Sequence, residues 1–123
     1  MREVKRRTFQ CFGEWNQLME ERSSPGWSGC VGGESRVQGW GRVDGLPWYF
    51  RARGAAWSLE IVDDESIDPQ QLPIVGEVSG WLIEEDYGVS PQASYMASSA
   101  AWSLIEKCIE KFRAGELPYW PPE

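Results

Sequence analysis

The chain of 123 residues contains no histidine. Histidine is the commonest general base in enzymes and the commonest metal ligand, so this absence excludes Ser-His and Cys-His nucleophile pairs and most metal centres. An enzyme built from this chain would have to rely on carboxylates such as Glu60 or Glu84, on lysine or tyrosine, or on an unassisted cysteine. We therefore expect a protein that is not an enzyme and that holds neither a cofactor nor a metal ion.

Cysteine and long apolar runs are also scarce. The three cysteines, Cys11, Cys30 and Cys108, follow neither a zinc nor a redox spacing, which predicts free thiols in a reducing compartment. The basic start, MREVKRR, lacks the apolar run of a signal peptide, and no later segment approaches the roughly 20 apolar residues of a transmembrane helix. These features predict a cytoplasmic protein that does not enter membranes.

Tryptophan is the residue in excess, with 8 in the chain, and three of them fall in WGRVDGLPWYFRARGAAWSLEI, residues 40–61. Asp44-Gly45 is a strong signal for a two-residue hairpin turn, and Gly54-Ala55 suits a second one. With these turns, Trp48 pairs with Gly41 and then with a residue of the third strand, Ile61. Both turns select the same apolar face, which a slip of one residue would reverse. The segment is therefore predicted to be a three-stranded meander.

The two faces of this meander have different characters. One carries Trp48, Phe50 and Trp57, which we expect in the core. The other face is expected to form a surface rich in aromatic and arginine side chains, which we call the predicted aromatic face. Its residues are Trp40, Tyr49, Arg51 and Arg53.

The flanking segments complete a single α+β domain over residues 1–123. Apolar residues at three-and-four spacing predict an N-terminal helix over residues 9–22, and the Gly- and Ser-rich residues 23–35 predict a loop. A fourth strand is expected over residues 74–84. Ser90 is the expected N-cap of a long C-terminal helix that ends before Gly115. The predicted fold class is an antiparallel sheet of about four strands covered by that helix.

Negative charge is concentrated in one part of the chain, since residues 54–106 hold ten acidic side chains and no basic one. Two acidic clusters stand out, and they can come together if the fourth strand lies beside the third. The clusters have three interpretations: solvated loops, a patch that docks on a basic protein surface, or oxygen ligands for calcium. The candidate binding residues in them are Asp63, Asp64, Glu65, Glu84, Glu85 and Asp86.

The predicted aromatic face has three interpretations as well. Arginine side chains cover aromatic rings on sheets with nothing bound, and the same residue types are enriched at protein interfaces. Stacking of single-stranded nucleic acid or of a small ligand is the alternative. The net charge of −7 disfavours nucleic acid, above all the double-stranded form, because affinity for it depends on neutralising phosphates.

In size, acidity and lack of histidine, the chain is similar to the small inhibitors of bacterial and phage conflict, such as anti-CRISPR proteins and toxin-immunity proteins. This resemblance is one of kind and covers no motif. It implies a stoichiometric, non-enzymatic protein binder whose partner has a basic surface.

Overall fold

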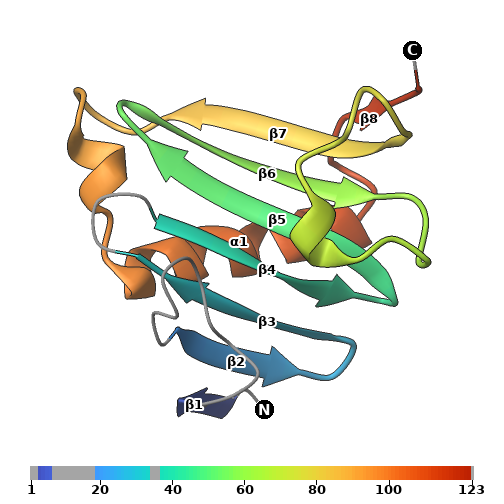
Figure 1. Cartoon of the computed structure of the whole chain (residues 1–123), viewed down its shortest axis with the longest axis horizontal. Helices are drawn as coiled ribbons and strands as arrows, with labels where there is room; N and C mark the ends of the chain where they lie inside the picture. Colours follow the sequence, from blue (N-terminus) through green and yellow to red (C-terminus); the bar gives the residue numbers. More distant parts are fainter. Residues whose placement is uncertain (1–2, 7–18, 34–36, 123) are drawn as a thin grey trace.

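The computed structural model describes residues 3–6, 19–33 and 37–122. Eight strands form one antiparallel sheet in which strands that follow each other in sequence are neighbours (Figure 1). These strands are β1 (Glu3–Arg6), β2 (Glu20–Ser24), β3 (Trp27–Gly32), β4 (Val37–Val43), β5 (Leu46–Arg53), β6 (Ala56–Val62), β7 (Gly80–Asp86) and β8 (Tyr119–Trp120). The described helices are α1 (Ser98–Arg113) and two 3-10 helices, η2 (Pro69–Gln71) and η3 (Gln92–Tyr95).

The predicted fold class, a four-stranded sheet with helices at both ends, is wrong. The sheet has twice that number of strands, and the structure describes no N-terminal helix. Residues 20–22, the end of the predicted helix, belong to β2 and pair with β3, while residues 9–18 lie outside the described residues. The meander that the turns predicted is the centre of a larger sheet.

The register of that central meander is confirmed. Trp48 pairs with Gly41 on β4 and with Ile61 on β6. Asp44 and Gly45 both have positive φ angles, of 49° and 86°, as the first predicted turn requires. Gly54, at a φ of 61°, begins the second.

In its described part, residues 23–33, the glycine-rich segment predicted as a loop belongs instead to a hairpin of β2 and β3. It turns at Pro25-Gly26, and its glycines make room for the largest side chain of the core. A Cβ atom at Gly29 would overlap the indole ring of Trp48, whose Nε1 donates to the Ser28 carbonyl at 3.2 Å. Glycine is required in β3 because the Trp48 ring lies across the backbones of two neighbouring strands.

The C-terminal helix begins seven residues later than predicted. Its first residue is Ser98, and Ser90 caps nothing because the intervening residues are held by the turn between β5 and β6. The Ala93 N–H donates to the Gly54 carbonyl at 2.9 Å, and the Gly54 N–H donates to Ser94 Oγ at 2.7 Å. These tertiary hydrogen bonds compete with helical ones.

The predicted fourth strand also starts too early. Its first two residues, Ile74 and Val75, donate their N–H groups to the side chain of Glu60 instead of to a strand. The chain then reverses at Gly76, where φ is 112°, and β7 begins only at Gly80.

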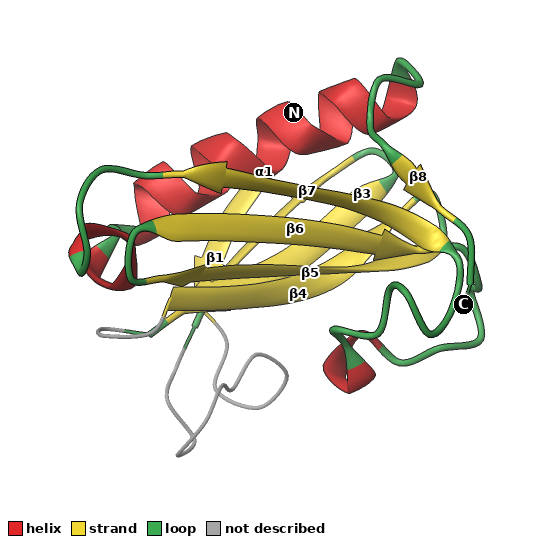
Figure 2. Cartoon of the chain, turned by 90° about the horizontal axis from the view of Figure 1, so that it is seen from above, coloured by secondary structure: helices red, strands yellow, loops and turns green. Residues whose placement is uncertain are grey.

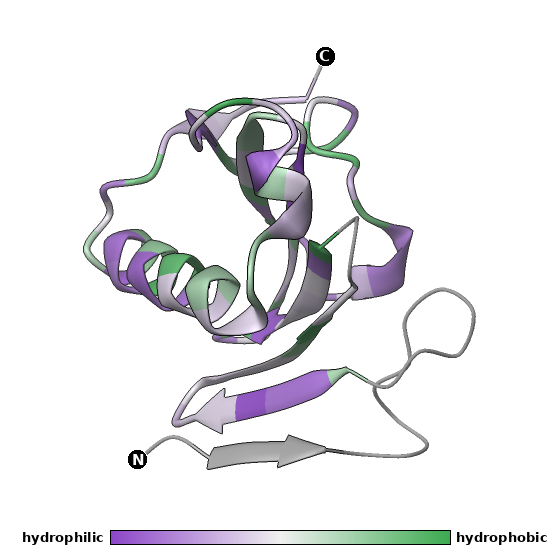
Figure 3. Cartoon of the chain, turned by 90° about the vertical axis from the view of Figure 1, so that its left-hand side faces the viewer, coloured by the Kyte–Doolittle hydropathy of each residue, from purple (hydrophilic) through white to green (hydrophobic). Residues whose placement is uncertain are grey.

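The sheet separates two layers. Helix α1 lies on one face, the helix face, and the segment of residues 63–79 that contains η2 lies on the other, the outer face (Figures 2 and 3).

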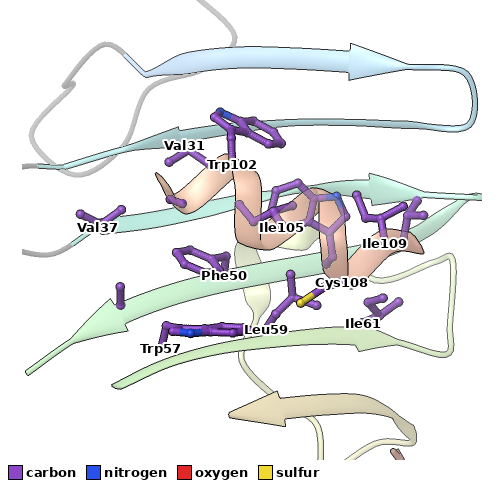
Figure 4. Close-up of a cluster of buried hydrophobic side chains, with 14 of the residues drawn as sticks. Val31, Val37, Phe50, Trp57, Leu59, Ile61, Trp102, Ile105, Cys108 and Ile109 are labelled. Carbon is purple, nitrogen blue, oxygen red and sulfur yellow. The ribbon is translucent and has the colours of Figure 1, made fainter. Parts of the chain in front are cut away.

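The main core is between the sheet and α1. Its members Trp48, Phe50 and Trp57 are buried, as predicted. Trp102 of α1 is fully buried as well and packs edge-on against Trp48, with 5.9 Å between ring centroids. Figure 4 shows Trp102, Ile105 and Cys108 directed from α1 onto the strands.

Candidate functional site

The predicted aromatic face lies on the outer face of the sheet, but part of it is covered. Tyr49 is only 9% exposed because it packs with Val62 and Leu72 under the segment of residues 63–79. Its hydroxyl donates to Gln38 Oε1 at 3.2 Å. Trp40 is half-buried beside Met19 and Cys30. An aromatic ring must be open on one side to stack on a base or a ligand, and Tyr49 is not.

The two arginines of this set differ in environment. Arg51 is half-buried between Gln38 and Ser58, and Arg53 is exposed at the end of β5. The structure therefore keeps the four predicted residues on one face, but of these it leaves only Arg53 exposed.

Glu60 is the buried charged residue of the outer face, with 4% of its surface exposed. Its carboxylate accepts hydrogen bonds from the N–H groups of Ile74, at 2.7 Å, and Val75, at 3.4 Å. Burial raises the pKa of Glu60, while these two hydrogen bonds and the charge of Arg51 act in the opposite direction. Glu60 thus holds the segment of residues 63–79 on the sheet, a structural role that occupies its carboxylate.

The two acidic clusters do not come together. In the β6–β7 hairpin, Val62 pairs with Gly80 and Ala56 pairs with Asp86, which places the clusters at opposite ends of both strands. Seven-residue strands separate them by about 20 Å. Asp63, Asp64 and Glu65 lie at one end, and all three are exposed. They do not form one patch with the second cluster.

The first cluster is partly engaged in local contacts. Asp64 accepts hydrogen bonds from the N–H and hydroxyl of Ser66, at 2.9 and 2.6 Å, and these bonds lower the pKa of Asp64. Asp63 accepts from the Tyr119 hydroxyl at 3.0 Å. These side chains stabilise a turn and the position of β8.

The second cluster, Glu84, Glu85 and Asp86, is exposed along β7. No described residue forms an ion pair with any of the three, so no described cation neutralises their negative charges. Side chains alternate along it, with Glu84 opposite Ser58 on the outer face and Glu85 opposite Trp57 on the helix face.

Exposed apolar side chains lie at the two ends of the same strand. Among the described residues, the large hydrophobic side chains that are exposed are Val89, Tyr95, Tyr119 and Trp120, at 73%, 65%, 50% and 48%. Tyr119 and Trp120 form β8, beside the first two residues of β7. Val89 and Tyr95 follow the last residue of β7. We call this set, together with Glu84, Glu85 and Asp86, the β7 surface.

The far end of the β7 surface is hollowed. A groove of about 660 Å³ is lined by aromatic and aliphatic side chains of the β7–η3 connection, of η3 and of the start of α1. They include Tyr87, Pro91, Tyr95, Met96 and Ala100. The sequence did not indicate a groove here because the residues after Ser90 were expected in the C-terminal helix, and Tyr87 was assigned to no element. At the other end, Tyr119 and Trp120 lie in LPYWPPE, whose prolines do not suggest a strand from the sequence.

The expectation of three free thiols is wrong. Cys30 is disulfide-bonded, and the other half of its bridge lies outside the described residues. Cys108 is free and buried, and burial raises the pKa of its thiol to about 12. The cytoplasmic placement rested on free thiols, so this bond removes its main support.

Two further features bear on the predicted class of site. In the described ranges, no group of three or more acidic or cysteine side chains is placed to hold a metal ion. No helix in the part of the chain that the structure describes is long and apolar enough to cross a membrane.

No family model, no curated protein and no solved structure matches this chain.

Proposed function

We propose that this protein is a stoichiometric, non-enzymatic binder of another protein, and that the β7 surface contacts the partner. The observation that carries the proposal is the distribution of exposed apolar side chains. All four that the described residues expose lie at the two ends of one strand, and three acids lie between them. Tyrosine and tryptophan are enriched at interface hot spots, and they contribute most when a polar rim surrounds them.

The charge of the β7 surface supports a partner with a basic surface. Glu84, Glu85 and Asp86 follow one another without an ion-paired cation among the described residues, and the chain as a whole carries −7. Such a field accelerates encounter with a basic protein and disfavours an acidic one. The resemblance in kind to small inhibitors is consistent with binding of this sort.

The alternative, binding of a small ligand or single-stranded nucleic acid at Trp40, Tyr49, Arg51 and Arg53, has less support. Tyr49 is covered, and Trp40 is half-buried. A catalytic role finds no support in Glu60, because its carboxylate is occupied by two backbone N–H groups.

Affinity capture with matched variants tests the proposal. The bait is the full chain, as wild type or with Y119A/W120A or E84K/E85K, and the recovered proteins are quantified by mass spectrometry. The control, E65K/E77K, makes the same charge change at exposed positions outside β7. We expect the wild type and the control to recover the same basic proteins. The two β7-surface variants should fail to recover them.

The purified partner then separates the two contributions. We expect E84K/E85K to slow association, since charge steers encounter, and Y119A/W120A to speed dissociation, since buried aromatics hold the complex. A set of captured proteins that is the same for all four baits, or no enrichment over bare resin, would contradict the proposal.

A further inference from the structure

Within the described residues, one edge of the sheet is open beside most of β7. The strand pairs with β6 along its whole length, from Gly80 to Asp86. On its other side, β8 pairs only with Gly80 and Trp81. Figure 2 looks onto this edge and shows no other strand beside the remainder of β7. The open part, Ile83–Asp86, spans about 13 Å of extended backbone.

The backbone groups of alternate residues point out of this edge. The Leu82 N–H donates to the Pro118 carbonyl at 3.2 Å, and the Leu82 carbonyl accepts from Trp120 Nε1 at 3.3 Å, so Leu82 faces away from β6. The N–H of Tyr87, at an odd position, donates instead to Ala55 at the β5–β6 turn. By this alternation the N–H and C=O of Glu84 and Asp86 also face outward, and no described residue bonds them.

An open edge of this kind pairs with any extended chain unless side chains prevent it. Here the charges decide which chain can pair. A second copy of β7 laid against the first would bring acidic side chains together at close range, which is destabilising. A strand with Lys or Arg at alternate positions would instead place its cations beside Glu84 and Asp86 on the outer face. The acidic side chains therefore disfavour pairing of β7 with a second copy of β7 and favour pairing with a basic strand.

We propose that the partner adds an extended, basic segment to the edge of β7, as a further strand in line with β8. Main-chain hydrogen bonds to Glu84 and Asp86 hold this segment, and alternate basic side chains give it specificity. One end of the added strand meets Trp120 and the other meets the groove beside Tyr95. The inference rests on the proposed function and adds the mode of binding to it.

Proline at position 84 tests the backbone component. Because the N–H of Glu84 faces the open edge, Glu84→Pro removes a donor to the added strand and no hydrogen bond to β6. Glu84→Ala is the matched control, since it loses the same carboxylate and keeps the N–H. Far-UV circular dichroism and thermal melts of both variants establish that each is folded.

The probe is a fluorescein-labelled ten-residue peptide of alternating lysine and threonine, with binding to the full chain followed by fluorescence anisotropy. We expect the wild type to bind it, Glu84→Ala to bind it a few times more weakly, and Glu84→Pro to bind it at least about tenfold more weakly than Glu84→Ala. A second peptide of the same sequence, with every main-chain amide N-methylated, keeps the charge but has no N–H to donate to a β-ladder. It should bind the wild type at least about tenfold more weakly, a comparison that needs no variant.

Three results would each overturn strand addition. These are equal affinity of Glu84→Pro and Glu84→Ala, equal affinity of the two peptides, and no binding of the all-L peptide to the wild type. None of them decides the proposed function, which the capture experiment tests independently through Tyr119, Trp120 and the acidic side chains.

Discussion

Gly41 offers the sharpest test of how this sheet is packed. It pairs with Trp48 on one side and with Gly29 on the other, so its missing side chain would point toward the helix face. A Cβ atom there would lie 2.5 Å from Gly29 Cα and closer still to the Ser28 carbonyl oxygen, whereas real Cβ atoms stay beyond about 3.0 Å. Both neighbours are backbone atoms, which cannot rotate away as a side chain can.

The expected cost of Gly41→Val follows from these contacts. Overpacking a well-packed core costs about 1 to 3 kcal/mol, and rigid backbone neighbours place this case at the upper end. Replacing glycine also restricts the unfolded chain, which offsets about 0.4 to 1 kcal/mol. The net loss is on the order of 2 kcal/mol, or about 8 °C in melting temperature for a chain of this size.

Urea unfolding and thermal melts of Gly41→Val and Ser28→Val measure this difference. Ser28 lies on the neighbouring strand and is exposed on the outer face, so the same new residue should change stability there by no more than about 0.5 kcal/mol. Equal stability of the two variants would refute the packing argument, because it would mean that the helix face at Gly41 has room for a side chain.

Two further predictions concern buried groups. Burial raises the pKa of Glu60, so its contribution to stability is fully present below the ordinary value of 4.5 and is lost as pH rises through the raised pKa. Glu60→Gln should therefore gain stability relative to the wild type between pH 4 and pH 7 in urea unfolding, and a constant difference would contradict this. With a pKa of about 12, the Cys108 thiol should resist iodoacetamide at pH 8 in the folded protein and react once it is denatured. In the same denatured, unreduced sample Cys30 should stay unlabelled, and its labelling would show that the disulfide is absent.

The candidate site could be predicted only in part. The residue types of the acidic clusters are visible in the sequence, as is their position near strand ends, residues 63–65 after β6 and residues 84–86 at the end of β7. The expectation that the clusters meet was wrong because β6 and β7 are antiparallel, which places the end of β6 beside the start of β7 and not beside its end. The start of the last long strand was misplaced for a different reason, since Ile74 donates its N–H to Glu60, a contact between positions 14 residues apart that no local pattern signals.

The sequence by itself determined the centre of the sheet. Asp44-Gly45 and Gly54-Ala55 specify tight turns through local backbone preferences, and period-two alternation then assigns each side chain of β4, β5 and β6 to a face. Local chemistry suffices there because pairing partners are close in sequence. The prediction failed at Gly29, because glycine there was taken as typical of a loop. Gly29 instead lies in a strand, where the Trp48 ring, 19 positions away in sequence, occupies the space of a side chain. Only the tertiary structure decided that Tyr49 is covered and that the edge of β7 is open, because both depend on where segments distant in sequence pack.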